Sequence, residues 1–325
     1  MNKINRRHLL AGAAVLGLAL PALAQTYPAK PVRVVLPYSA GSGPDAVVRH
    51  VGEKLSKEWG QSIVVDNKPG ANGWLAIGDV KRASPDGYNL LTVDATHMTL
   101  QPHLYKQLPF VPESDFELVA PLYFTNFFVV VGANSPWKSM ADLLAAAKAK
   151  SGEVTYGSWG LGSVAHVGTA MLERATGANM RHVPFKELPQ LYTSVATGEV
   201  DWAFGTAATV GPLYQAKKVR LLAYAGARRV AGYQDVPTVA EAGGPAAFEL
   251  STWVAMYAPK GTSKAIAERL YASSQKALAE ADVKSRLATV GFEAWTATPA
   301  EAVKVAARDK ARYAEVVKQA NISLD

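Results

Sequence analysis

The hydrophobic pattern of this chain alternates between short apolar runs and amphipathic segments of helical period. A β-branched run at 32–36 (VRVVL) precedes a helical stripe over 45–59, and further apolar runs lie at 62–67 and 88–95. A glycine-led segment from Gly70 to Lys81 predicts a second helix between those runs. This β-α-β-α-β order is typical of a doubly wound parallel sheet.

The same pattern recurs further along the chain. A continuous apolar strand within FTNFFVVVGANSPW leads out of the first unit, and Ser139 is placed to cap the next helix. Strand-like runs such as VTYGS, MRHVPF, VDWAFG and RLLAYAG follow, and STWVAMYAPKG returns the chain to the first unit. The pattern therefore predicts an α/β fold of two lobes, each a doubly wound mixed sheet with flanking helices. Residues 25–125 plus 251–325 form the first lobe and 126–250 the second.

In each lobe a β-rich run feeds a glycine-serine loop that opens directly into a helix. The first loop is PYSAGSGPD (37–45) and the second is YGSWGLGSVAH (156–166). A helix start leaves backbone N–H groups unpaired at the positive end of the peptide dipoles, which suits an anion. Ligands of open α/β sheets lie beyond the carboxyl ends of the strands, so two such loops predict a small carboxylate held between the lobes.

Several side chains of the two loops are candidate ligand contacts. In the first loop Ser39, Ser42 and the amides of 40–43 can donate to a carboxylate, as can Ser158, Ser163 and the amides of 159–163 in the second. Asp45 is either the cap of its helix or a ligand contact. Trp159 is either a pocket wall or an indole packed beneath its loop. His166, one turn inside the second helix, either contacts ligand or packs.

The N-terminus has the features of a secretory signal. Three positive charges precede the apolar run LLAGAAVLGLALPALA, which ends in the small-residue site Ala22-Leu23-Ala24. We therefore predict a signal peptide over 1–24, cut before Gln25, and a periplasmic location. Pro21 interrupts the run and argues against a membrane anchor. Arg6-Arg7 matches part of a twin-arginine signal, which leaves the export route open.

Charge and composition narrow the classes of partner. Removing the three positive charges of the signal lowers the formal net charge from +7 to +4. No run of like charge carries interleaved aromatic residues, so nucleic acid is not an expected partner. The absence of cysteine excludes disulfides and thiolate nucleophiles. The six histidines lack metal-ligand spacing, and we predict neither a metal nor a cofactor.

One enzyme hypothesis fits the glycine loops. Residues 41–46 and 160–165 both match G-x-G-x-x-A, and Asp66 stands where a dinucleotide fold places its ribose-binding acid. An exported dinucleotide-binding oxidoreductase is therefore the alternative function. Pro44 stiffens the turn that would wrap a pyrophosphate, and no acid or base for hydride transfer is evident. Neither loop serine has the G-x-S-x-G flanks of a hydrolase, so we predict no enzymatic activity.

Several blocks, in order, resemble the Bug family of periplasmic solute-binding components of tripartite tricarboxylate transporters. They are YPAKPVRVVLPYSAGSGPD, VVDNKPGANGWLAIGDV, ASPDGYNLLTVDATH, LYKQLPF, VTYGSWGLGS and VPTVAEAG. The resemblance implies a two-lobed Venus-flytrap fold without catalysis, which captures a small carboxylate for membrane permease subunits. It also implies that 38–45 and 158–163 grip the carboxylate. A receptor that opens and closes is most simply a monomer.

The chain departs from the family pattern at a few positions. The interior of the first loop is altered from A-G-G-x-x-D, Trp159 replaces a small residue, and Gly205 stands where an acid is common. Lys186 is followed by ELPQ instead of a glycine-containing turn, which brings a cation toward the cleft. These departures suggest an aromatic or dicarboxylic acid as ligand. The predicted ligand-binding residues are Tyr38, Ser39, Ala40, Gly41, Ser42, Asp45, Thr96, His97, Ser158, Trp159, Gly160, Ser163, His166, Lys186 and Gly205.

Overall fold

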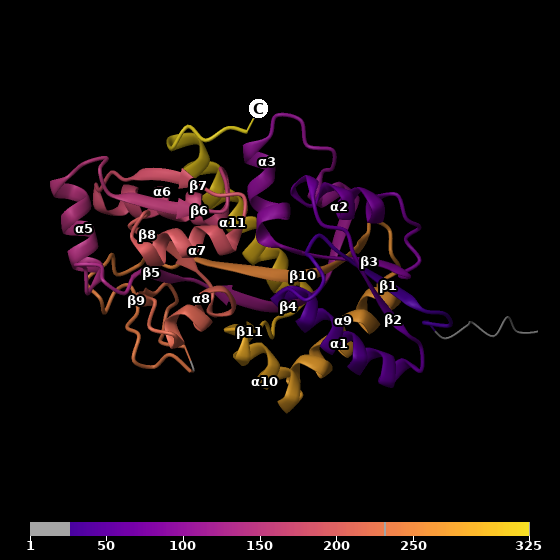
Figure 1. Cartoon of the computed structure of the whole chain (residues 1–325). Coiled ribbons are helices and arrows are strands. Elements are labelled where there is room, and N and C mark those ends of the chain that lie inside the picture. The colour runs from indigo at the N-terminus through magenta and orange to yellow at the C-terminus, as the bar shows by residue number, and fades with distance from the viewer. Residues whose placement is uncertain (1–26, 231, 325) are drawn as a thin grey trace, which may run out of the picture.

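Two β-sheets, each flanked by helices, make up the protein (Figure 1). The structure is a computed structural model that describes residues 27–230 and 232–324. The predicted signal peptide over 1–24 lies outside the described residues. The expectation of two mixed α/β sheets with flanking helices is confirmed.

The first sheet has the strand order β11-β4-β10-β3-β1-β2. β1, β2 and β3 are parallel, whereas β4, β10 and β11 pair antiparallel. The strands are β1 (Val32–Leu36), β2 (Ile63–Asn67), β3 (Asn89–Asp94), β4 (Phe116–Asn126), β10 (Ser251–Pro259) and β11 (Phe292–Ala294). The carboxyl ends of the three parallel strands therefore lie at one edge of this sheet.

Helices and tight turns connect these strands. The helices are α1 (Gly43–Trp59), α2 (Trp74–Lys81), α3 (Gln101–Leu104), α4 (Pro112–Asp115), α9 (Lys264–Ala279) and α10 (Ala281–Thr289). A 3-10 turn, η1 (Ala71–Gly73), precedes α2, and a π-helical turn, η2 (Thr96–Leu100), follows β3. The helix expected from Gly70 to Lys81 is thus divided, since Asn72 has a positive φ of 51°.

The second sheet has the order β7-β6-β8-β5-β9. β6, β7 and β8 are parallel, and β5 pairs antiparallel with β8 and β9. The strands are β5 (Phe128–Gly132), β6 (Thr155–Ser158), β7 (Arg181–Pro184), β8 (Trp202–Gly205) and β9 (Val219–Tyr224). The helices of this lobe are α5 (Met140–Ala149), α6 (Val164–Thr176), α7 (Leu188–Thr197) and α8 (Ala207–Gln215). β5 and β8 are buried along their whole length, which explains their continuous apolar sequences.

The chain passes between the two sheets along β4 and β10, which lie antiparallel from Phe116 opposite Pro259 to Asn126 opposite Ser251. Phe127 joins β4 to β5, and its carbonyl accepts a hydrogen bond of 2.7 Å from the Ala225 amide. These segments therefore cross from one lobe to the other (Figure 1).

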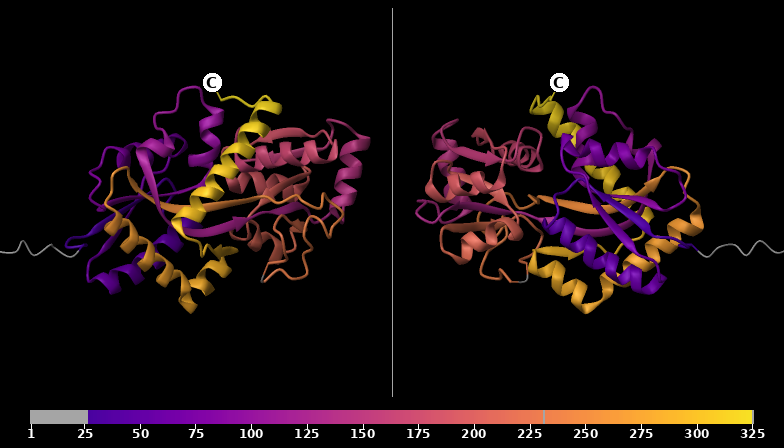
Figure 2. Two further views of the ribbon diagram at one scale, coloured as in Figure 1. Left: turned by 180° about the vertical axis from the view of Figure 1, so that it is seen from behind. Right: turned by 45° about the vertical axis from the view of Figure 1, so that its right-hand side comes forward.

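The C-terminal helix α11 (Pro299–Gln319) makes a further connection, which the sequence did not reveal (Figure 2). Its first turns pack on the first lobe, where Asp309 accepts from the Trp253 indole at 2.9 Å. Its last turns join a cluster with Leu104 of α3 and Val167 of α6. α11 therefore touches both lobes. Among the described helices, none combines the length and apolar character that a membrane span requires.

Candidate functional site

Both glycine-serine loops follow parallel strands and lead into capped helices. Ser42 caps α1, with its hydroxyl 3.4 Å from the Asp45 amide, and Ser163 caps α6, with its hydroxyl 3.3 Å from the His166 amide. Ser163, a candidate ligand contact, is thus the N-cap of its helix. The assignment of Asp45 as the cap of α1 is wrong, because the helix begins at Gly43 and Ser42 takes that position.

Asp45 instead holds the first loop together from inside. Asp45 is only 2% exposed, and its carboxylate accepts from the Gly41 amide at 2.8 Å, the Asn67 side chain at 2.8 Å and Arg49 at 3.0 Å. Burial acts to raise the pKa of Asp45, but the hydrogen bonds from Arg49, Asn67 and Gly41 lower it overall. The carboxylate thus remains ionised and faces the loop backbone.

Few amides of the first loop stay free for a ligand. Gly41 donates to Asp45, Ser42 donates to the Ser39 carbonyl at 3.2 Å, and Pro44 has no N–H. Among the described residues, the amides of Ala40 and Gly43 have no hydrogen bond. Ser39, Ala40 and Gly41 are exposed, and an added Cβ at Gly41 would meet nothing within 4 Å. Among the amides of 40–43, the first loop therefore presents two free donors, and Ser39 adds its hydroxyl.

Ser158 shapes the second loop. It is fully buried, and its hydroxyl lies 2.9 Å from the Gly160 carbonyl, 3.1 Å from the Gly160 amide and 2.6 Å from His182 Nε2. Ser163 donates its amide to the Gly160 carbonyl at 3.3 Å. Ser158 would have to exchange these partners to reach a ligand. Within the described chain the amides of Trp159 and Leu161 keep no hydrogen bond.

A stack of three rings supports the second loop from beneath. The ring centroids of Tyr156 and His182 lie 4.9 Å apart, and those of His182 and His166 lie 4.2 Å apart with the two imidazole planes nearly parallel. The Gly162 amide donates to His166 Nδ1 at 3.0 Å, so this nitrogen carries no proton. Burial lowers the pKa of His166, and burial together with His166 lowers that of His182 to about 4. Both rings are therefore neutral at pH 7. His182 was not predicted, because the contact joins β7 to the loop after β6.

Low pH should reduce the stability that this stack of rings contributes to the fold. Because the pKa values of both histidines lie below the ordinary 6.5, the unfolded chain takes up their protons first as pH falls. We expect the free energy of unfolding to decrease by about 1–3 kcal/mol between pH 6.5 and pH 4 through this pair. Urea denaturation of the wild type and of His182→Gln at pH 7.5 and pH 4.5 measures this decrease in the free energy of unfolding. An equal pH dependence in both proteins would contradict the assignment.

Trp159 is partly buried against its own lobe. Its indole stacks on Phe127 at 5.8 Å between ring centroids and packs on apolar clusters at both faces of the second sheet. Intermediate exposure leaves part of the ring accessible. Trp159 thus links the second loop to the segment that joins the lobes.

A further group lies at the carboxyl edge of the first sheet. Asp94 ends β3 and accepts from the Thr96 amide at 2.9 Å, and His97 Nδ1 lies 2.8 Å from the same carboxylate oxygen. The Tyr38 ring meets His97 edge-on at 6.4 Å, and burial raises the pKa of the Tyr38 hydroxyl. Tyr38, Thr96 and His97 are therefore brought together around Asp94. Asp94 was not predicted as a site residue, although it lies within the segment VDATH.

The two remaining candidates differ in exposure. Lys186 is exposed in the turn after β7, at the same sheet edge as the second loop, and no ion pair involves it within the described chain. Gly205 is buried at the end of β8. An added Cβ there would lie 2.4 Å from Val210 and 3.1 Å from the Tyr192 ring, so only glycine fits.

A cavity of about 350 Å³ lies between the lobes beside the first loop. Gly41, Ser42 and Gly43 form one wall, α8 faces them from the second lobe, and Arg286 of α10 lines the cavity. Arg286 was not predicted, because its amphipathic helix has the pattern of a solvated face. The second loop does not line this cavity. It abuts the first lobe elsewhere, where an added Cβ at Gly162 would lie 2.6 Å from Leu104.

The sequence between Val47 and Ile322 matches the family described as "Tripartite tricarboxylate transporter family receptor". The chain belongs to this receptor family. The resemblance to Bug proteins is also confirmed. BugT of Bordetella pertussis is 29% identical and matches over 96% of this chain and 95% of its own length. A UPF0065 protein encoded in the tcbD-tcbE intergenic region of Pseudomonas sp. strain P51 is 32% identical, covering 89% and 87% of the two chains.

Two solved structures agree with the fold. Rpa4515 of R. palustris, described with adipate, matches with a TM-score of 0.82 and 28% identity over 92% of this chain and 100% of its own. MatC of Rhodopseudomonas palustris, described with bound malate, matches with a TM-score of 0.76 and 27% identity over 90% and 100%. Membership in a solute-receptor family does not favour the dinucleotide alternative. Asp66, its proposed ribose ligand, is held by Arg33 at 2.9 Å.

Proposed function

We propose that this protein is an extracytoplasmic solute-binding receptor that captures a small carboxylate between its lobes. The observation that carries the proposal is the pair of capped glycine-serine loops, one per lobe, each with free amides and each reaching the opposite lobe. An added Cβ at Gly43 would lie 3.9 Å from Ala208 of α8, and Gly162 abuts Leu104 of α3. Family membership supports the same function.

A dicarboxylate is the ligand class that the chain fits best. The two similar structures are described with adipate and malate, both dicarboxylates. Lys186 and Arg286 are exposed cations near the two loops, and neither has an ion pair among the described residues. One carboxylate would lie on the loop amides and the other would face a cation. Gly205 supplies no acid to attract an amine. The aromatic acid is the less favoured class, because Trp159 already stacks on Phe127.

Binding would proceed by closure of the lobes around the anion. A hydrogen bond to a charged acceptor contributes about 1.5–3 kcal/mol, so the four free loop amides together contribute roughly 6–12 kcal/mol. Cation contacts add to this sum, which has to exceed an association cost of about 4–15 kcal/mol. A ligand that bridges both loops binds the closed form better than the open one and therefore drives closure.

The remaining parts of the proposal concern the cellular role. The receptor would act in the periplasm after removal of residues 1–24 and deliver its ligand to the membrane permease subunits of a tripartite tricarboxylate transporter. It would perform no catalysis and would work as a monomer. No cofactor is required for this cycle.

Calorimetric titration of the mature chain tests the ligand class. Adipate and hexanoate form a matched pair that differ by one carboxylate, and malate, benzoate and alanine complete the panel. We expect adipate or malate to bind at least about tenfold more tightly than hexanoate, since one charged hydrogen bond is worth that factor. Tightest binding of alanine, or binding of none of the acids, would contradict the proposal.

A further inference from the structure

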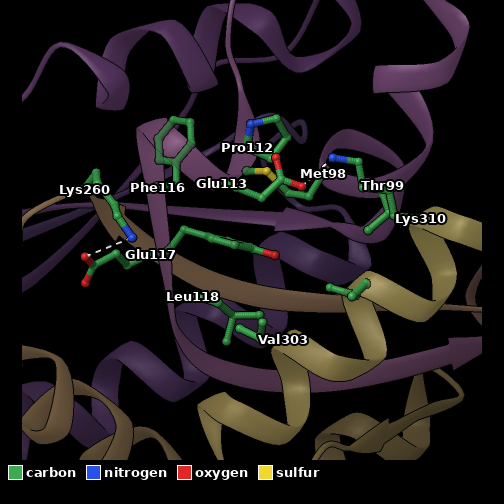
Figure 3. Close-up of a pocket in the computed structure, with 13 residues that line it drawn as sticks. Met98, Thr99, Pro112, Glu113, Phe116, Glu117, Leu118, Lys260, Val303 and Lys310 are labelled. Atoms are coloured by element: carbon green, nitrogen blue, oxygen red, sulfur yellow. Dashed lines mark hydrogen bonds and ion pairs between the residues drawn. The ribbon is translucent and has the colours of Figure 1, made fainter.

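A second pocket, of about 360 Å³, lies in the first lobe, and none of the candidate ligand residues lines it (Figure 3). Its walls come from η2, β4 and α11, and they are mostly hydrocarbon. The apolar lining residues are Met98, Pro112, Phe116, Leu118, Val303, Ala306 and Ala307. A concave apolar site of this size with a few polar groups is the usual form of a small-molecule site.

One polar side chain in the lining of this pocket has no hydrogen-bond partner among the described residues. Tyr257 of β10 is only 6% exposed, yet its hydroxyl makes no hydrogen bond among the described residues. Burial raises the pKa of this hydroxyl, so it stays protonated and remains a donor. Thr99, the other buried polar residue in the lining, donates its hydroxyl to the Ala95 carbonyl at 2.6 Å. The Tyr257 hydroxyl is thus a free donor in the pocket lining, and an oxygen atom of a bound molecule would accept from it.

The charges at the mouth of the pocket are already neutralised. Glu117 pairs with Lys260 at 3.5 Å on one side, and Glu113 pairs with Lys310 on the other (Figure 3). An incoming anion would meet the two glutamates, and an incoming cation would meet the two lysines. The rim therefore favours an uncharged molecule, in contrast to the loop amides of the carboxylate site.

We propose that this pocket is a second ligand site for a small, uncharged, mostly apolar molecule that carries one hydrogen-bond-accepting oxygen. The hydrocarbon part lies among Met98, Phe116 and α11, and the oxygen accepts from Tyr257. Because the walls come from the first lobe and from the part of α11 that packs on it, this molecule and the carboxylate between the lobes occupy separate sites.

Cyclohexanone is a suitable probe, with methylcyclohexane as a partner of similar shape that lacks the oxygen. We expect saturable binding of cyclohexanone to the mature protein in ligand-observed NMR, unaffected by saturating adipate. Tyr257→Phe should weaken cyclohexanone binding about fivefold to tenfold and leave methylcyclohexane unchanged, as expected for loss of one neutral hydrogen bond. Ala307→Phe should remove binding of both probes, since it places a ring in the pocket.

Ala311→Phe is the matched control, because Ala311 is exposed one turn further along α11 and does not line the pocket. It should bind both probes like the wild type, and thermal unfolding confirms that each variant is folded. Absence of binding to the wild type, equal binding to Ala307→Phe, or competition by adipate would each overturn the proposal. These outcomes do not depend on whether the carboxylate receptor function holds.

Discussion

Replacing Gly41 by valine should weaken carboxylate binding at least about hundredfold. Gly41 has a φ of 79°, which costs an L residue about 1–2 kcal/mol and a β-branched residue more. The loop would relax away from this conformation and displace the neighbouring Ala40 and Gly43 amides. Loss of two hydrogen bonds to a charged acceptor, about 3–6 kcal/mol, corresponds to that factor. Calorimetric titration with the acid of the panel that binds the wild type most tightly measures this loss of affinity. Gly160, with a φ of 121°, should behave in the same way.

Gly198 provides the matched control for this substitution. It also has a φ of 79° with nothing within 4 Å of an added Cβ, but it caps the C-terminus of α7. Gly198→Val should lose comparable stability and keep wild-type affinity. If Gly41→Val and Gly198→Val bind the acid equally well, the first loop is not the carboxylate site.

The second large effect is expected at Asp45, which organises the same loop from below. Asp45→Ala removes the shared acceptor of Gly41, Arg49 and Asn67 and leaves their donors without this partner. We expect the free energy of unfolding to fall by about 3 kcal/mol, and affinity for the carboxylate to fall with it, because Gly41 is no longer fixed. Urea denaturation gives the first quantity and calorimetry the second.

Glu53 is the appropriate comparison, since it lies on the same helix but is exposed and pairs only loosely with His50 at 3.5 Å. Glu53→Ala should change the free energy of unfolding by less than about 0.5 kcal/mol and leave binding intact. A similar loss of stability in both variants would show that Asp45 contributes only through the charge of α1.

The sequence was sufficient for the strands that carry the loops, because their apolar runs and glycine punctuation are local signals. β1 spans Val32–Leu36 as predicted, and the two glycine loops begin where the strands end. The capping residue of α1 was misassigned for a local reason as well. Ser42 and Asp45 are both good caps, and Pro44 at the second helical position marks Ser42 as the cap.

The site details that were missed depend on contacts between distant segments. The sequence suggested that the Ser158 hydroxyl was available to a ligand. In the structure this hydroxyl is hydrogen-bonded to His182, which follows 24 residues later in the chain. Arg286 reaches the interlobe cavity only because α10 packs beside the first loop. Which loop amides are free and which bond within the loop likewise depends on the loop conformation. The hydrophobic periodicity of the sequence does not specify that conformation.

The position of α11 has a mechanical consequence for the receptor cycle. Arg312 donates to the Glu249 carbonyl at 3.0 Å on the second lobe, whereas Asp309, one turn earlier, is anchored to Trp253. Rotation of one lobe against the other must therefore strain or displace this helix. The helix thus stiffens the connection between the lobes and limits the angle to which they open. Substitutions on α11, remote from the bound acid, would alter the rate of ligand release by changing that stiffness.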